Sequence, residues 1–237
     1  MKLNPNNLKI STLAVLWISL IASGALVAVI TIRYSYNILT LTYSGIGVFI
    51  LLCACAALWW LTRRQTQPGQ ASLIEHAIQI GMVLGLLWII EISINNFIAP
   101  PLPARDTIDN LFWAVITLAT IALATRQTIQ TGSFSDAVTI GAWSGFTSGA
   151  LSCGMALVVI VFAMPFITRD PLNVAEWAAR GTDISAPNMA AYFAYETLAG
   201  AFLHLVLLGI IFGTILGLLG GAIGKSFGWV LKMAKPH

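Results

Sequence analysis

Ionisable side chains interrupt otherwise apolar stretches at a few places, and these residues have the types that could do chemistry. Glu91 lies within one apolar run, and Asn95 follows it by one helical turn. Glu196 and His204 lie two helical turns apart in another apolar run. A charged group at membrane depth is costly, so it usually faces the interior of a helix bundle and has a partner. We therefore predict that Glu91, Asn95, Glu196 and His204 line a polar pocket.

Three interpretations of this pocket follow from its residue types. In the first, Glu91 binds a proton or a cation in a small permease-like or transport-associated protein whose pocket faces outward. In the second, the carboxyl groups are structural, and the chain is a non-catalytic membrane subunit or scaffold that packs against partner helices. The third is an intramembrane enzyme, which needs Glu91 or Glu196 within hydrogen-bond reach of His204, directly or through one water. We favour the first interpretation and expect no enzymatic activity.

The sequence contains no motif typical of a metal or cofactor site. Glu91, Glu196 and His204 could in principle bind a metal together, but their spacing matches no known ligand pattern. The three cysteines lie inside apolar runs, where packing is their ordinary role. The segment from Gly220 to Ser226 is partly similar to a phosphate-binding loop, but Leu219 occupies the position of the first glycine of that motif. We predict no metal ion and no cofactor.

Composition places these residues in a membrane protein. Of the 237 residues, 58% are hydrophobic and only 9% are charged, whereas about 25% of the residues of a soluble domain are charged. The net charge of +3 comes from Lys and Arg that are scattered between apolar runs. A nucleic-acid partner would require a clustered basic face. The expected partner is the lipid bilayer, together with a second copy of the chain or another membrane protein.

The elements that must position the pocket are six apolar blocks, each long enough to cross a bilayer as an α-helix. An all-α, polytopic transmembrane bundle of six spans is therefore predicted, forming a single integral membrane domain over residues 1–237. The fifth and sixth blocks exceed one bilayer thickness, so they should tilt, kink or project into the interface. The predicted spans are residues 10–32, 41–62, 74–99, 108–125, 137–167 and 188–224.

Basic residues in the connections give an orientation, because cytoplasmic loops carry more Lys and Arg. With six spans both termini lie on one side, which holds eight Lys and Arg against four on the other. We predict cytoplasmic termini, and the compact connections favour a bacterial inner membrane. The eight are Lys2, Lys9, Arg63, Arg64, Arg126, Lys225, Lys232 and Lys235, and the four are Arg33, Arg105, Arg169 and Arg180.

Glycines recur at four-residue spacing in three of the predicted spans. Small residues in such a row let a second helix backbone approach closely, which gains dispersion contacts that lipid cannot supply. We therefore predict close, glycine-mediated packing of spans three, five and six. The residues are Gly81 and Gly85 in span three, Gly141, Gly145 and Gly149 in span five, and Gly209, Gly213, Gly217 and Gly221 in span six.

The connection between the fifth and sixth spans contains a helix start signal. Asp170 can cap a helix whose first turn contains Pro171. A short helix from Asn173 to Arg180, ended by Gly181, is expected there.

Overall fold

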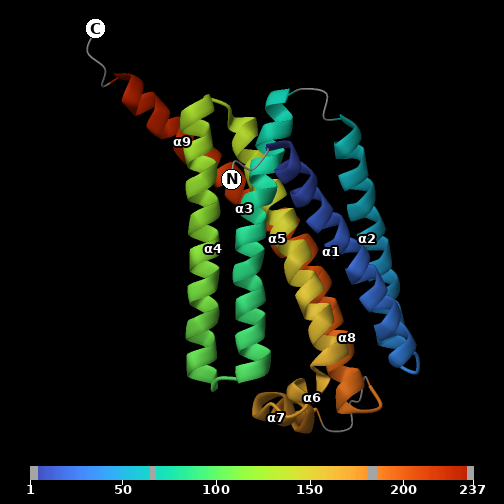
Figure 1. Cartoon of the computed structure of the whole chain (residues 1–237). Helices are drawn as coiled ribbons and strands as arrows, with labels where there is room; N and C mark the ends of the chain where they lie inside the picture. Colours follow the sequence, from blue (N-terminus) through green and yellow to red (C-terminus); the bar gives the residue numbers. More distant parts are fainter. Residues whose placement is uncertain (1–4, 65–67, 181–185, 234–237) are drawn as a thin grey trace.

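Within the part of the chain that the structure describes, six helices are long and apolar enough to cross a membrane, consistent with a multi-pass membrane protein. The computed structural model describes residues 5–64, 68–180 and 186–233, and the regular elements in these ranges are all helical (Figure 1). Lys2, Gly181 and Lys235, which were named above, lie outside the described residues.

The helices alternate in direction and are joined by short connections. We call the end of the bundle that holds α6 and α7 the α7 side, and the opposite end the terminal side (Figure 1). The elements are α1 (Pro5–Arg33), α2 (Ile38–Arg64), α3 (Pro68–Ser93) with the π-helical η1 (Ile94–Ile98), α4 (Leu102–Thr131), α5 (Phe134–Phe162), α6 (Met164–Ile167), α7 (Pro171–Ala179), α8 (Met189–Leu203), the π-helical η2 (His204–Phe212) and α9 (Gly213–Met233).

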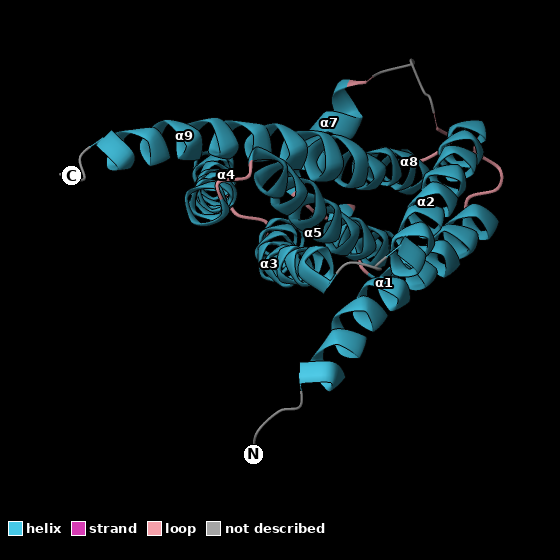
Figure 2. Ribbon diagram, turned by 90° about the horizontal axis from the view of Figure 1, so that it is seen from above, coloured by secondary structure: helices cyan, strands magenta, loops and turns pink. Residues whose placement is uncertain are grey.

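Helix α5 lies at the centre of the bundle (Figure 2). It contacts α1, α3, α4, α8, η2 and α9. In the most apolar stretch of α5, 67% of the residues are buried, against 17% in that of α4. The rest of the molecule is therefore arranged around one buried helix.

The fifth predicted span extended to residue 167, but α5 ends at Phe162 and a separate turn, α6, follows. Pro165 explains this break, because a proline ring clashes with the carbonyl group four residues earlier in a continuous helix. That carbonyl group belongs to Val161, and it accepts a hydrogen bond from Arg33 Nη1 of α1 at 3.0 Å. A side chain of a neighbouring helix thus supplies the hydrogen bond that this carbonyl group cannot receive from Pro165.

On the terminal side of the bundle, α5 meets the α9 and η2 segment with little side-chain volume between the backbones. A Cβ atom added at Gly213 would lie 2.6 Å from the carbonyl oxygen of Gly141. One added at Gly209 would lie 2.8 Å from the carbonyl oxygen of Gly145. On the other face of α5, a Cβ at Gly81 of α3 would lie 2.6 Å from the carbonyl oxygen of Ser144. A methyl group has no room at these three positions.

A further close contact, between α4 and α9, was not predicted. A Cβ added at Gly220 would lie 2.7 Å from the carbonyl oxygen of Ile121, and one at Gly224 would lie 2.7 Å from that of Thr125. Helix α4 has no glycine row of its own here, so the sequence pattern showed only one of the two surfaces.

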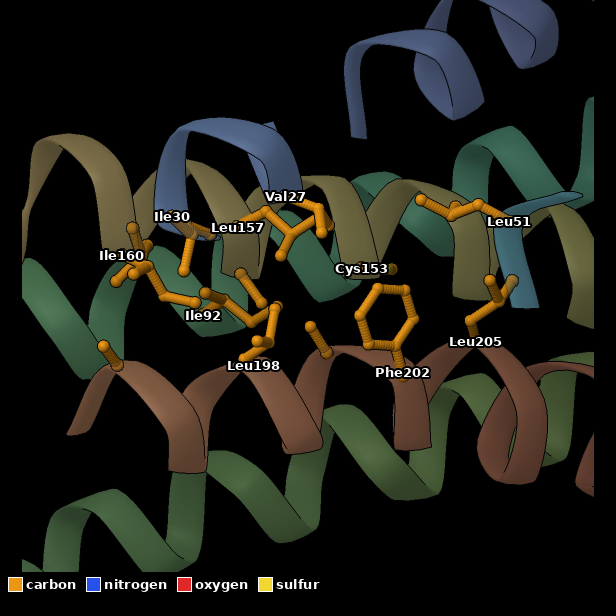
Figure 3. Close-up of a cluster of buried hydrophobic side chains, with 14 of the residues drawn as sticks. Val27, Ile30, Leu51, Ile92, Cys153, Leu157, Ile160, Leu198, Phe202 and Leu205 are labelled. Atoms are coloured by element: carbon orange, nitrogen blue, oxygen red, sulfur yellow. The ribbon is translucent and has the colours of Figure 1, made fainter. Parts of the chain in front are cut away.

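The α7 half of the bundle has a core of larger side chains. Figure 3 shows Val27 and Ile30 of α1, Leu157 of α5 and Leu198 of α8 gathered between the helices. Cys153 of α5 lies in the same cluster with no exposed surface, so it packs as an apolar residue. This half is assembled by side chains and not by backbone contact.

Candidate functional site

A cavity of about 240 Å³ lies between the α3–η1 segment, α5 and α8. Glu91, Asn95 and His204 line it, so three of the four residues predicted to form a pocket are found at one cavity. Asn96 and Thr197 add polar groups to the lining, which the prediction did not include. Ile92, Ala156, Val159, Gly200 and Ala201 complete the wall.

Glu91 belongs to a network that connects α3 with α4. Its side-chain oxygen Oε1 accepts a hydrogen bond of 2.7 Å from Asn95 Nδ2. The same nitrogen donates to Asp109 Oδ1 of α4, also at 2.7 Å. The other polar atom of this amide, Asn95 Oδ1, is buried and has no hydrogen-bond partner. One amide group therefore bridges two carboxyl groups and keeps an unused acceptor.

Asp109 was not predicted as a partner of Glu91. The connection between η1 and α4 is short, and antiparallel helices joined in this way place residues equally far from the turn beside each other. Asn95 and Asp109 lie on opposite sides of that turn, fourteen residues apart. Equal counting outward from Pro100 and Pro101 pairs Asn95 with Asp106 and not with Asp109, so the sequence alone did not identify this neighbour.

His204 lies at the opposite wall of the cavity, at the junction of α8 and η2. Its Nδ1 atom is 2.9 Å from the carbonyl oxygen of Gly200. Since a carbonyl group only accepts, Nδ1 carries the hydrogen there, and Nε2 of the neutral ring is an acceptor. The imidazole also packs edge-on against Trp88, with 5.5 Å between ring centroids.

No hydrogen bond joins His204 to Glu91 or Glu196 among the residues that the structure describes. The direct carboxylate–imidazole pair of the enzymatic interpretation is therefore not formed.

Each polar wall of the cavity includes a residue of a π-helical segment. Asn95 lies in η1, and His204 is the first residue of η2. A π-helix leaves wider turns than an α-helix and is often found at functional sites. This local geometry was not visible in the hydropathy pattern.

Glu196 does not line the cavity and belongs to a cluster nearer α7. Arg180 Nη2 donates to Glu196 Oε1 at 3.1 Å and to Glu176 Oε1 of α7 at 3.2 Å. The buried Tyr192 hydroxyl group also hydrogen-bonds to both carboxyl groups. The Arg180 guanidinium carbon lies 3.6 Å from the centroid of the Tyr192 ring. This cluster connects the end of α7 to α8.

The predicted short helix of the last connection is present as α7, with the predicted cap at Asp170, but it begins at Pro171 and ends at Ala179 where Asn173 and Arg180 were predicted. The Asp170 side chain caps it by accepting a hydrogen bond from the Leu172 backbone N–H at 3.1 Å. The other carboxylate oxygen of Asp170 pairs with Arg105 Nη2 of α4 at 2.7 Å, and only 5% of the Asp170 side chain is exposed. Helix α7 is thus fixed to α4 at one end and to α8 at the other.

A second cavity, of about 430 Å³, is apolar and lies between α2, α5 and η2. Phe49 and Cys53 of α2, Trp143 of α5 and Leu205 of η2 are among its lining residues. Its lining has no carboxyl, imidazole, amino or guanidinium group, so it offers volume but little polar chemistry.

Among the described residues, no group of three His, Cys, Asp or Glu side chains is arranged to hold a metal ion. The chain matches no family model, and no curated protein or solved structure is similar to it. The class of the protein therefore follows from its six apolar helices, and its function must be argued from the cavity.

Proposed function

We propose that this chain is a small permease-like or transport-associated membrane protein, whose polar cavity around Glu91 binds an ion or a small polar solute. The observation that carries the proposal is a cavity of about 240 Å³ that exposes a carboxyl, an amide and an imidazole group to one another between membrane-spanning helices. A cavity with few convergent polar groups is the usual form of a ligand site. No enzymatic reaction is proposed.

The difference between the two halves of the bundle supports one side of the membrane as the side from which a solute reaches the cavity. We propose that close glycine packing of α3, α5 and α9 closes the terminal side, which the distribution of Lys and Arg assigns to the cytoplasm. The cavity lies in the α7 half, so it would open outward. Glu91 is seven residues from the end of η1, or about 10 Å along a helix at about 1.5 Å per residue. A solute from the outer solution would therefore travel only a short distance to reach it.

The scaffold interpretation remains as the second candidate because of the apolar cavity between α2, α5 and η2. Phe49 lines that cavity and is 68% exposed. A helix of a partner protein or of a second copy could fill this volume. Under this interpretation the Glu91 network is structural, and no solution path to it is needed.

Chemical accessibility distinguishes the two candidates. The test begins with a variant in which Cys53, Cys55 and Cys153 are replaced by alanine, and then introduces Thr197→Cys at the cavity. In intact cells, a membrane-impermeant maleimide should label Thr197→Cys, and it should not label the matched variant Ala124→Cys, whose side chain is fully buried on the terminal side. Absence of labelling at Thr197→Cys would contradict an outward-facing hydrated cavity.

Thermal unfolding of purified Glu91→Gln tests whether the carboxyl group is held for function. Functional groups are commonly kept at a cost in stability, so we expect the variant to be as stable as the wild type or more stable. A loss of stability of a few kcal/mol would identify Glu91 as a structural residue and favour the scaffold.

A further inference from the structure

We propose that Glu91 and Asp109 form a proton-carrying pair held by Asn95, and that the ion bound at this cavity is a proton. The transport role of that proton rests on the proposed function, whereas its binding is argued from the geometry of the network alone.

The first argument is the count of donors and acceptors. Asn95 Nδ2 lies 2.7 Å from an oxygen of each carboxyl group, so one amide nitrogen holds the two carboxyl groups side by side. An ionised carboxyl group has acceptors only, so two of them cannot hydrogen-bond to each other. Among the described residues, the Asn95 amide is the side-chain donor to both groups, and a proton on one of them supplies a further donor and removes one of the two negative charges.

The second argument is the absence of a compensating cation. Arg105 lies one helical turn from Asp109 on α4, but its guanidinium group pairs with Asp170 at 2.7 Å. Arg33, from α1, donates to the carbonyl oxygen of Val161. Among the described residues, no ion pair includes Glu91 or Asp109. Two adjacent negative charges without a cationic partner are disfavoured here, because Glu91 is only 8% exposed and Asp109 is half-buried.

Other titratable groups on the neighbouring elements do not change this balance. His204, from the α8–η2 junction, is fixed by Gly200 and Trp88, and Asp106 on α4 is exposed. The residues of α5 and α9 that carry a charge and have described side chains, Asp136 and Lys225, lie near the terminal side, and the Cys153 thiol of α5 is fully buried in the apolar cluster. Besides the carboxyl pair, His204 Nε2 is a second proton acceptor at the cavity, but only the pair places two acidic groups on one shared donor.

The third argument is that the two carboxyl groups have different surroundings. Glu91 is 8% exposed and lines the cavity, whereas Asp109 is half-buried and lies nearer to solution. A proton can pass from the Asp109 carboxyl group to the Glu91 carboxylate, which leaves Asp109 ionised and Glu91 neutral. The reverse transfer returns the proton to solution. The unused acceptor Asn95 Oδ1 is buried beside this path, where a water molecule that relays the proton would find a partner.

Infrared difference spectroscopy of the purified full chain tests the pair. A protonated carboxylic acid has a C=O stretching band that shifts in D₂O and disappears on ionisation. We expect the wild type at neutral pH to show this band with the intensity of one carboxylic acid per chain, and to lose it as the pH is raised. Absence of the band from the wild type at neutral pH would overturn the proposal, with no variant required.

Variants then assign the band. Both Glu91→Gln and Asp109→Asn should remove it, because the new amide donates to the remaining carboxylate and replaces the proton. The control Glu176→Gln changes a carboxyl group outside the network and should leave the band intact. A band that persists in both network variants would also overturn the proposal. A band assigned to the pair together with an unlabelled Thr197→Cys would refute the transport function while leaving the proton site in place.

Discussion

The two halves of helix α5 are held in different ways, and the difference separates what the bundle needs to fold from what it can use for function. On the terminal side, Gly141 and Gly145 bring α5 into backbone contact with α9 and η2. On the α7 side, α5 borders a polar cavity, and the surrounding helices are connected by ion pairs and hydrogen bonds. The contact of α5 with α9 and η2 in the first half has no room for a methyl group, and the second half keeps an open volume beside a buried carboxyl group.

The contrast also predicts which forces each half depends on. Backbone contacts between apolar helices rest on dispersion and fit, and they do not respond to salt or to charge. The α7 side is held together by ion pairs of differing exposure. Loss of a more buried pair should therefore lower the free energy of unfolding more than loss of an exposed one. Three substitutions test this difference between the two halves.

The largest effect is expected from Arg105→Ala. Removal of one partner of a buried ion pair leaves an uncompensated charge and costs about 3–5 kcal/mol, and the Asp170 carboxylate that would remain is 95% buried because only 5% of its side chain is exposed. Equilibrium unfolding should show this loss, and hydrogen exchange should increase in α7. The control Asp106→Asn changes an exposed neighbour on α4. Equal stability of the two variants would show that the pair does not hold α7.

A smaller effect is expected from Gly145→Ala, for which Gly200→Ala is the matched control. The added methyl group at Gly145 would overlap the Gly209 carbonyl group and lie 2.9 Å from the Gly213 Cα atom, and overpacking costs about 1–3 kcal/mol. At Gly200 no other group lies within 4 Å of the added atom, so its unfolding free energy should change by no more than about 0.5 kcal/mol. Similar losses in both variants would remove the distinction between the halves.

The smallest effect is expected from Arg180→Ala. Its pairs with Glu176 and Glu196 are partly exposed, with side-chain exposures of 31%, 46% and 37% for the three residues. Exposed ion pairs contribute about 0.2–1 kcal/mol and are screened by salt. The loss should therefore lie in this range at low ionic strength and shrink at high salt. A loss as large as that of Arg105→Ala would mean that burial does not rank these pairs.

Much of the architecture was predictable because the bilayer fixes the length of an apolar helix. The six spans were found in this way, and the capped start of α7 followed from the Asp170–Pro171 pattern. The break after Phe162 was missed because the residues around Pro165 are as apolar as those of the helix. Hydropathy measures the environment of a segment and is insensitive to a local loss of backbone hydrogen bonds.

The site was predicted in part. Glu91 and Asn95 are four residues apart on one helix, so their contact follows from helical geometry. Glu196 and His204 share a helix as well, but the structure directs Glu196 to Arg180 and His204 to the cavity. Which neighbours a helix residue meets depends on the rotation of that helix within the bundle, and a single sequence does not determine this rotation.

The wide turns of η2 affect which face of the continuous α8–η2–α9 helix each residue occupies. Glu196, Gly200 and His204 follow one another at intervals of four residues, and so do Gly209, Gly213 and Gly217. The step from His204 to Gly209 is five residues, which in an α-helix would turn the second row by about 100° relative to the first. The π-helix takes up that additional residue, because its hydrogen bonds join residues five apart. Deletion of one residue between Leu205 and Leu208 would therefore give an uninterrupted α-helix in which the polar row and the glycine row remain aligned.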